Sequence, residues 1–359
     1  INTFSYFFFR YLPDASQTLN ITYKPYSAQI ATTSETENIL LIFGESLYSQ
    51  HIQLYGYNRQ TFPRMEKRIK SNPEWQIASG ISGGIATATS TLLFFNGIRE
   101  PANHNELQSK TANIFRLAKQ AGYKTYYFSN QESRLTMSFG AKNVDEIITN
   151  DMKLIFFSKY HDEGLAKLLN EIDFTTGKHF VVLHMRSPHS PFENRYKGRE
   201  AEFEKFKPAA ESKDRFTYYQ NTYDNALLYT DMAIDSMVAE FEKLNQGKNY
   251  SIYITADHGE LINYNGMYGH NNLVIEQAKV PFFVKKKNNA ALPPVVSHYQ
   301  MVKMIAQDIG AVIHNPNEED NTYYLHGNNI DFPYDFIKYQ INDNGTVTET
   351  EKNNTSNLK

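Results

Sequence analysis

Continuous apolar runs alternate with longer stretches of helical periodicity along this chain. The clearest apolar runs are Asn38–Phe43, Lys124–Phe128, His179–His184, Ser251–His258 and Val280–Val284. Uninterrupted runs of this length are typical of strands in a parallel sheet whose two faces are both covered.

Four stretches carry the spacing of an amphipathic helix. They are residues 111–121, which stop at Gly122, and residues 162–171, 216–243 and 297–309. Because these helical patterns alternate with the apolar runs, the sequence predicts an α/β fold with a mainly parallel central sheet.

The two flanks of this alternating region are polar. We expect residues 1–37 to form a membrane-proximal segment and linker, 38–315 the catalytic domain, and 316–359 a C-terminal extension. Asp343-Asn344-Gly345 predicts a hairpin turn, and the composition from Glu349 to Lys359 predicts disorder.

The segment Phe4–Leu12 is rich in aromatic residues and contains one arginine. It is shorter than the roughly 20 apolar residues that span a bilayer, but it has the character of an interfacial anchor. The alternative is a helix or strand that packs on the domain. Since the chain begins at Ile1, we expect it to be part of a longer protein.

Composition excludes several classes of function. A net charge of -3 argues against a broad nucleic-acid-binding surface, so no nucleic-acid partner is expected. The sequence has no cysteine, which excludes disulfides and thiolate ligands. Any metal must therefore be held by oxygen and imidazole groups.

Groups able to bind a metal stand at the ends of three predicted strands. The run Asn38–Phe43 is followed by Glu45. The run from His179 ends at His184, and the run from Ser251 ends at Asp257-His258. Taken alone, each would be a turn or a solvated side chain. Because ligands of open α/β sheets bind beyond the carboxyl ends of the strands, we expect the four groups to converge.

The stretch after the third strand strengthens this interpretation. Asp257-His258-Gly259-Glu260 is followed by a glycine-rich return to His270, a pattern that suits a metal or phosphate site. Oxygen and imidazole ligands together favour zinc (Zn2+), and manganese (Mn2+) is less well served by so much imidazole.

A glycine-rich segment from Gly80 leads into a run of hydroxyl residues at a predicted helix start. Backbone amides and the helix dipole at such a start attract phosphate, and a metal on the hydroxyl would make it a nucleophile. The alternative is a simple helix cap. This segment does not choose among its four hydroxyls, Thr87, Thr89, Ser90 and Thr91.

Several motifs follow one another in a fixed order. They are Gly44-Glu45-Ser46 with residues 56–63, Ala86-Thr87-Ala88 with Ser90, residues 184–191, residues 223–231, and residues 257–260 with His270. This ordered set, from about Asn38 to Val284, resembles the catalytic domain of the bacterial phosphoethanolamine transferases. That family includes the lipid A enzymes behind polymyxin resistance, within the alkaline phosphatase and sulfatase superfamily. The resemblance implies a three-layer sandwich.

The resemblance also implies a role for each matched residue. Thr87, rather than Thr89 or Thr91, would be the attacking hydroxyl. The main zinc would be held by Glu45, Thr87, Asp257 and His258. The transferred phosphate, a second metal or the leaving group would be contacted by His184, His189 and His270, and the substrate by Asn130.

The implied reaction moves phosphoethanolamine from phosphatidylethanolamine to lipid A or another envelope glycan, through a covalent intermediate on the threonine. One tightly bound zinc is implied, with room for a second. The implied place is the periplasmic face of the bacterial inner membrane, with an N-terminal transmembrane anchor that this sequence does not contain.

The sequence departs from that family in one respect. The family's nucleophile helix commonly carries proline and flanking cysteines, whereas this chain has Leu92 and Leu93 and no cysteine. The departure leaves the acceptor open. A phosphoglycerol transferase, or a phosphatase or sulfatase-type hydrolase, would use much the same ligands and is the alternative, as is a silent binding module that keeps the fold.

Overall fold

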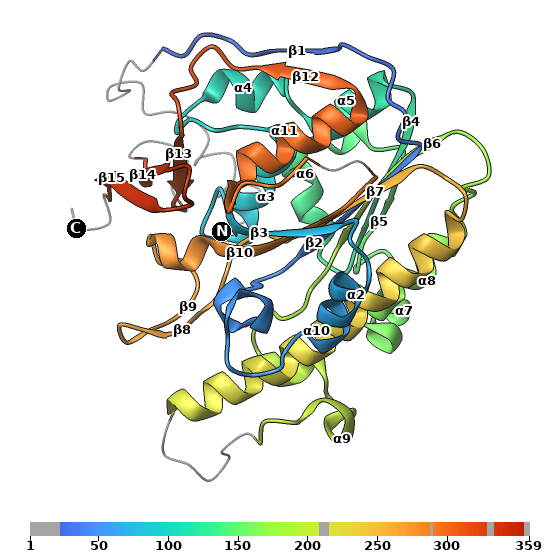
Figure 1. The fold of residues 1–359 in the computed structure, drawn as a ribbon, viewed down its shortest axis with the longest axis vertical. Coiled ribbons are helices and arrows are strands. Elements are labelled where there is room, and N and C mark those ends of the chain that lie inside the picture. Colours follow the sequence, from blue (N-terminus) through green and yellow to red (C-terminus); the bar gives the residue numbers. More distant parts are fainter. Residues whose placement is uncertain (1–21, 208–214, 288–289, 329–333, 355–359) are drawn as a thin grey trace, which may run out of the picture.

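The computed structural model describes residues 22–207, 215–287, 290–328 and 334–354. At its centre lies an eight-stranded sheet in the order β11-β3-β10-β7-β2-β6-β4-β5 (Figure 1). The strand bounds are β2 (Asn38–Gly44), β3 (Trp75–Ile81), β4 (Tyr123–Ser129), β5 (Glu146–Ile148), β6 (Lys178–His184), β7 (Tyr250–Ala256), β10 (Lys279–Lys285) and β11 (Val295–Ser297).

The predicted sheet is mainly parallel, as expected, with one exception. β10 runs antiparallel to both of its neighbours, whereas the other neighbouring pairs are parallel. The apolar run Val280–Val284 is therefore a strand, but its direction is opposite to that of the others.

Both faces of the sheet are covered, which explains why the strands are apolar without interruption. In β2, Leu40 and Ile42 join one core, while Ile39, Leu41 and Phe43 join the other. The first core also includes α2 (Pro63–Ser71), α8 (Glu163–Leu168) and α10 (Arg215–Leu244); the second includes α3 (Thr87–Asn96), α5 (Ile114–Gln120) and α11 (His298–Ile309). The expected three layers are present.

Shorter helices complete the described fold. They are α4 (His104–Ser109), α6 (Thr136–Phe139), α7 (Leu154–Tyr160) and α9 (Glu200–Phe203). The four helices predicted from periodicity are found as α5, α8 with a following 3-10 turn, α10 and α11.

The C-terminal extension forms its own antiparallel sheet, visible in red at one side of Figure 1. Its strands are β13 (Thr322–His326), β14 (Phe336–Ile341) and β15 (Val347–Asn353). The predicted hairpin turn joins β14 to β15, with Gly345 at φ 83°. Disorder from Glu349 onward is wrong for the residues up to Asn353, which pair with β14. Residues 355–359 lie outside the described residues.

Two further strand pairs flank the central sheet. β1 (Ser27–Ile30) pairs with β12 (Ala311–His314), so this part of the expected linker is a strand. β8 (Leu261–Tyr264) and β9 (Met267–Gly269) form a hairpin. The aromatic segment Phe4–Leu12 lies outside the described residues. None of the helices described here combines the length and apolar character that crossing a bilayer requires.

Candidate active site

Three neighbouring parallel strands bring their candidate ligands to one edge of the sheet. β2 is flanked by β6 and β7, and the three strands end level with one another. One ligand atom each from Glu45, His184 and Asp257 lies within 4.8 Å of the others, and all three residues are buried. The convergence expected from the strand ends is therefore present.

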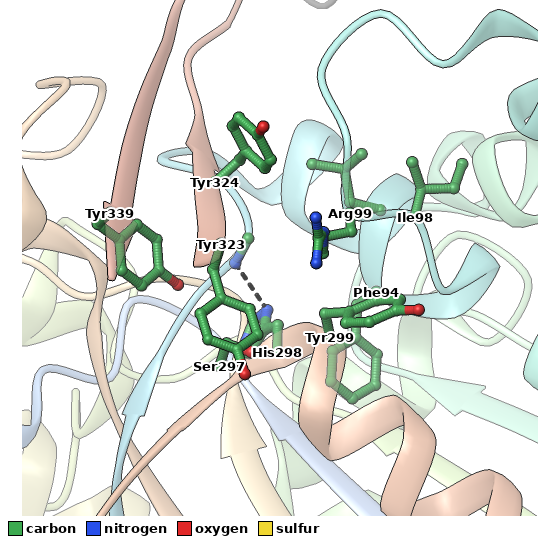
Figure 2. A pocket seen from close by; sticks show the side chains of 11 residues that line it. Phe94, Ile98, Arg99, Ser297, His298, Tyr299, Tyr323, Tyr324 and Tyr339 are labelled. Carbon is green, nitrogen blue, oxygen red and sulfur yellow. Dashed lines mark hydrogen bonds between the residues drawn. The ribbon is translucent and has the colours of Figure 1, made fainter. Parts of the chain in front are cut away.

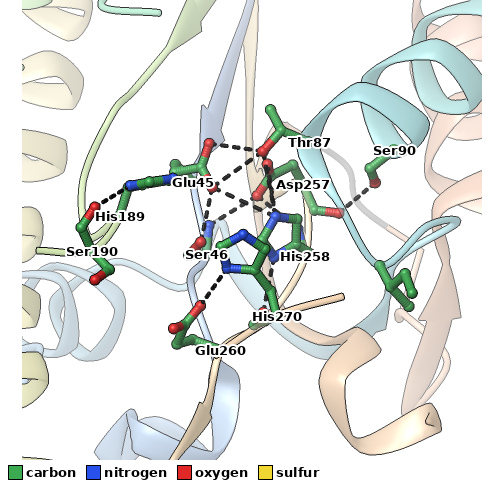
Figure 3. A network of polar contacts seen from close by, with 12 residues as sticks. Glu45, Ser46, Thr87, Ser90, His189, Ser190, Asp257, His258, Glu260 and His270 are labelled. Carbon is green, nitrogen blue, oxygen red and sulfur yellow. Dashed lines mark hydrogen bonds and ion pairs between the residues drawn. The ribbon is translucent and has the colours of Figure 1, made fainter. Parts of the chain in front are cut away.

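Thr87 lies against this cluster as the first residue of α3. Its Oγ1 is 3.1 Å from Oε2 of Glu45 and 3.4 Å from Nε2 of His258 (Figure 3). The helix start therefore places this hydroxyl beside the candidate metal ligands.

The neighbouring hydroxyls have other partners. Thr91 donates to the backbone oxygen of Thr87 at 2.6 Å, and Ser90 donates to the backbone oxygen of Asp257. Ser90 thus ties the nucleophile helix to the end of β7. A Cβ on Gly84 would lie 3.0 Å from the Ser90 nitrogen, so glycine lets the preceding loop pack against this first turn.

Two buried atoms in the cluster lack a hydrogen-bond partner among the described residues. They are Oδ2 of Asp257 and Nε2 of His184. Their other atoms are satisfied, since Oδ1 of Asp257 accepts from the Ser46 and His258 amides, and Nδ1 of His184 contacts the Tyr127 hydroxyl at 2.7 Å. Buried polar atoms without partners are costly, and oxygen and imidazole nitrogen are zinc ligands. The residues present therefore fit a zinc ion.

The pKa values of the two carboxylates in the cluster are shifted in opposite directions. Burial, and then the charge of Glu45, raises the pKa of Asp257 well above its ordinary value. Burial also acts to raise the pKa of Glu45, but His258, His189 and the Ser46 hydroxyl together hold it below its ordinary value. These opposite shifts favour a proton on Asp257 over one on Glu45, and a divalent cation bound to the cluster would compete with that proton.

Glu45 is fixed by two donors that the sequence did not identify. Gln131 donates from Nε2 to Oε2 of Glu45 at 2.7 Å and to the Met185 carbonyl at 3.0 Å. The Ser46 hydroxyl donates to the other carboxylate oxygen at 2.8 Å. These contacts orient the Glu45 carboxylate. The only sequence signal for the role of Gln131 was its position just beyond the end of β4.

Asn130 does not occupy the position expected of a substrate contact. It is buried, its Nδ2 donates to Asp162 at 2.8 Å, and its Oδ1 accepts from Asn150 at 2.7 Å. The carboxamide is thus engaged inside the protein, and its neighbour Gln131 contacts the cluster instead.

Two further predicted histidines lie beside His258. The His270 ring is 5.0 Å from the His258 ring and 5.8 Å from the His189 ring. Nδ1 of His270 is 3.1 Å from Glu260, whose other oxygen accepts from the Tyr219 hydroxyl at 2.7 Å. This hydrogen bond to Glu260 is the main cause that raises the pKa of His270. The arrangement makes His270 a candidate proton donor.

Other residues of the sequence motifs have structural roles. Asp224 of α10 is buried and bonds Arg59 and His51, each at 2.8 Å. Asp231, about two turns further along α10, accepts from the amides of Arg64 and Met65 at the start of α2. These motifs therefore hold the loop after β2 and helix α2 against α10.

A separate small cavity lies between the nucleophile segment and the C-terminal sheet (Figure 2). It is lined by Gly83, Leu93, Phe94, Ile98, Arg99, Ser297, His298, Tyr299, Tyr323, Tyr324 and Tyr339. Of these, His298 donates to the Ala256 carbonyl at 2.9 Å and accepts from the Gly83 amide at 3.1 Å. Burial lowers the pKa of His298 to about 3, so the neutral ring joins the nucleophile loop to β7.

The sequence matches a known family and several known proteins. The sulfatase family matches residues 37–309. Phosphoethanolamine transferase EptC of Escherichia coli strain K12 is 24% identical over 238 residues, which cover 63% of this chain and 40% of that protein. Kdo(2)-lipid A phosphoethanolamine 7''-transferase of Salmonella typhimurium is 26% identical over 287 residues, covering 75% of this chain and 47% of that protein. The chain spans less than half the length of these curated relatives.

Solved structures share the fold. The C-terminal periplasmic domain of Escherichia coli EptC superposes with a TM-score of 0.69 at 19% identity, covering 86% of this chain and 94% of that domain. The same domain has also been solved in complex with zinc, at a TM-score of 0.67, 19% identity and coverage of 87% and 96%. The integral membrane protein EptA of Neisseria meningitidis gives 0.62 at 22% identity, covering 81% of this chain and 59% of that protein.

Proposed function

The chain belongs to the sulfatase family, and we propose that it is the catalytic domain of a zinc-dependent phosphoethanolamine transferase. The observation that carries the proposal is the position of Thr87, a hydroxyl at a helix start 3.1 Å from a buried carboxylate of a metal-binding cluster. The relatives named above support the choice of phosphoethanolamine as the transferred group.

The residues that would hold one zinc are Glu45, Thr87, Asp257 and His258, with Nε2 of His184 close by. When bound, zinc supplies Lewis-acid stabilisation of phosphate oxygens and lowers the pKa of a coordinated hydroxyl. His189 and His270 are the proposed contacts for the phosphate or for a second zinc.

The chain's own residues then perform two displacements. Thr87 Oγ1 bonds to the phosphorus of phosphatidylethanolamine, and the bond from phosphorus to the glycerol oxygen breaks. Oε2 of Glu45 lies 3.1 Å from Oγ1 of Thr87 and takes the hydroxyl proton, and His270 protonates the glycerol oxygen of the leaving diacylglycerol.

In the second displacement an acceptor oxygen bonds to phosphorus, the bond to Thr87 breaks, and the proton held by Glu45 returns to Oγ1 of Thr87. His270, deprotonated by the first step, takes the proton of the entering hydroxyl. The amides at the start of α3 and the dipole of this helix favour the negative charge that develops on the phosphate oxygens in both steps.

The proposed acceptor is lipid A or another envelope glycan, and the proposed place is the periplasmic face of the bacterial inner membrane. Addition of an ammonium group to a lipid A phosphate lowers its net negative charge. Cationic polymyxins would then bind more weakly, which links this activity to resistance.

The mass of the peptide that contains Thr87 tests the proposal. After incubation with phosphatidylethanolamine, we expect this peptide to carry phosphoethanolamine and diacylglycerol to be released. Thr87→Ala should abolish both, while Thr87→Ser, which keeps a hydroxyl, should retain a measurable adduct. A glycerophosphate or bare phosphate adduct would identify the alternative enzymes instead, and wild-type turnover by Thr87→Ala would refute the role of Thr87.

A further inference from the structure

Several strongly exposed apolar side chains stand together at the start of α7. Met152, Leu154 and Ile155 are 61%, 59% and 86% exposed, and we call these three residues the α7 patch. An apolar cluster of this kind on a soluble surface marks an interaction site more often than scattered single residues do.

The α7 patch lies on the same edge of the sheet as the candidate active site. It follows the carboxyl end of β5, which is three strands from β2, or roughly 14 Å at ~4.8 Å per strand. Two hydrogen bonds link the segment before the α7 patch to the candidate site. The amide of Asn150 donates to the carbonyl of Gln131, and the side chain of Gln131 donates to Glu45.

Cations and aromatic rings lie on α7 and on the adjoining residues, including Lys153 just before α7 and Lys167 of α8. Lys159 and Lys167 each lie 4.8 Å from the centre of the Tyr160 ring, and Lys153 lies 5.7 Å from the Phe156 ring. Lys153 also pairs with Glu171, whereas Lys159 and Lys167 form no ion pair with a described residue.

This combination has a known physical meaning. Exposed aliphatic side chains flanked by tyrosine, phenylalanine and lysine suit the boundary between lipid headgroups and acyl chains. The lysines complement the phosphate groups of an anionic membrane surface. A protein partner with a dry interface would not require lysines next to the apolar side chains.

We propose that the α7 patch docks on the surface of a phospholipid bilayer and thereby holds the candidate active site beside its lipid donor. The identity of that donor rests on the proposed function, but the docking itself does not. Met152, Leu154 and Ile155 would enter the headgroup region, and Lys159 and Lys167 would contact lipid phosphates.

Sedimentation of the chain with vesicles of phosphatidylethanolamine and phosphatidylglycerol tests the docking. We expect the wild-type chain to bind, and Leu154→Ser/Ile155→Ser to bind at least about tenfold more weakly, because two exposed aliphatic groups are lost. Ile30→Ser/Val312→Ser is the matched control, since both residues are exposed on β1 and β12, and it should bind like the wild type. The melting temperature of each variant checks its fold.

Charge provides a second test on the same vesicles. Lys159→Gln/Lys167→Gln should weaken binding to vesicles with phosphatidylglycerol, and it should not change binding to vesicles of phosphatidylcholine alone. Unchanged binding by the serine variant, or no binding by the wild type, would overturn the proposal. So would a wild-type dimer that becomes a monomer in the serine variant without any vesicle binding.

A soluble substrate separates this proposal from the proposed function. On a short-chain phosphatidylethanolamine below its micelle concentration, the serine variant should turn over like the wild type, while its turnover on vesicles falls. If neither protein acts on any phosphatidylethanolamine, the proposed function fails, and the vesicle binding still decides whether the α7 patch is a membrane surface.

Discussion

At the scale of single residues, the orientation of Glu45 is set by neighbours rather than by its own backbone position. Gln131 and Ser46 each donate to one carboxylate oxygen. A carboxylate held by two donors keeps its remaining lone pairs in fixed directions, which is the usual function of groups around a metal ligand.

Replacement of Gln131 by leucine should therefore weaken zinc binding. The leucine keeps a similar volume but removes the donor at 2.7 Å from Glu45, and we expect the zinc affinity to fall by about 10-fold or more. Competition with a chelating dye measures it. Gln246→Leu, at an exposed position, is the control. Zinc affinity equal to that of the wild type in Gln131→Leu would show that the donor is unimportant.

Asn130 and Gln131 also show where sequence reasoning reaches its limit. Both are polar residues at a strand end, and the resemblance pointed to Asn130. Successive side chains leave a strand in opposite directions, so one turns to Asp162 and the other to Glu45. The residue types alone do not tell which of the two side chains faces Glu45.

At the scale of elements, β13 completes the loop that precedes Thr87, the proposed nucleophile. The His326 amide donates to the Gly83 carbonyl at 2.9 Å, and the Ile85 amide donates to the His326 carbonyl at 3.1 Å. The His326 side chain contacts the Arg99 carbonyl at 3.0 Å from within the protein.

Acid should loosen this contact. Burial lowers the pKa of His326 to about 4, from 6.5. Between these values the unfolded chain binds more protons on this residue than the folded chain, so stability falls as the pH drops below about 6.5. His326→Gln keeps an N–H donor but does not titrate. In urea unfolding, it should lose roughly 2–3 kcal/mol less than the wild type between pH 7.5 and 4.5. Equal losses in both proteins would contradict this.

The elements of the central sheet could be predicted, but not all of their relations. Runs such as Asn38–Phe43 are apolar because helices cover both faces, and this burial is what the sequence records. The apolar pattern of the sequence did not indicate the antiparallel direction of β10 or the pairing of β1 with β12. Apolar pattern reports burial, and it does not report strand direction or the partner of a short edge strand.

At the scale of the whole molecule, the candidate site joins segments far apart in the chain. The proposed zinc ligands Glu45, Thr87 and Asp257-His258 come from the end of β2, the start of α3 and the end of β7. A cation that binds them all binds the folded chain and not the unfolded one, so it should stabilise the entire domain.

Removal of zinc should therefore lower the melting temperature by several degrees. At a free zinc concentration about 1,000 times the Kd, the stabilisation would be about 4 kcal/mol. Calorimetry with zinc and with a chelator measures the difference, and Asp257→Asn, which weakens a central ligand, should reduce it. The same difference in Asp257→Asn as in the wild type would place the zinc elsewhere.

The ordered motifs were recognisable because each fixes part of this long-range architecture. Arg59 and Asp224 pair across the molecule, as do the start of α2 and Asp231. The sequence therefore identified residues that lie close together in the fold, and their catalytic and metal-binding roles stay predictions, while several motif positions hold the scaffold together.

The pairing of β13 with the segment at Gly83 also has a consequence for folding during synthesis. Residue 326 is synthesised long after residue 87. Thr87 therefore leaves the ribosome before β13, the strand that pairs with the loop in front of it, has been made. Before β13 is synthesised, the segment Gly83–Ile85 lacks its backbone hydrogen bonds to His326. The loop before Thr87 is therefore completed by a strand that is synthesised long after it.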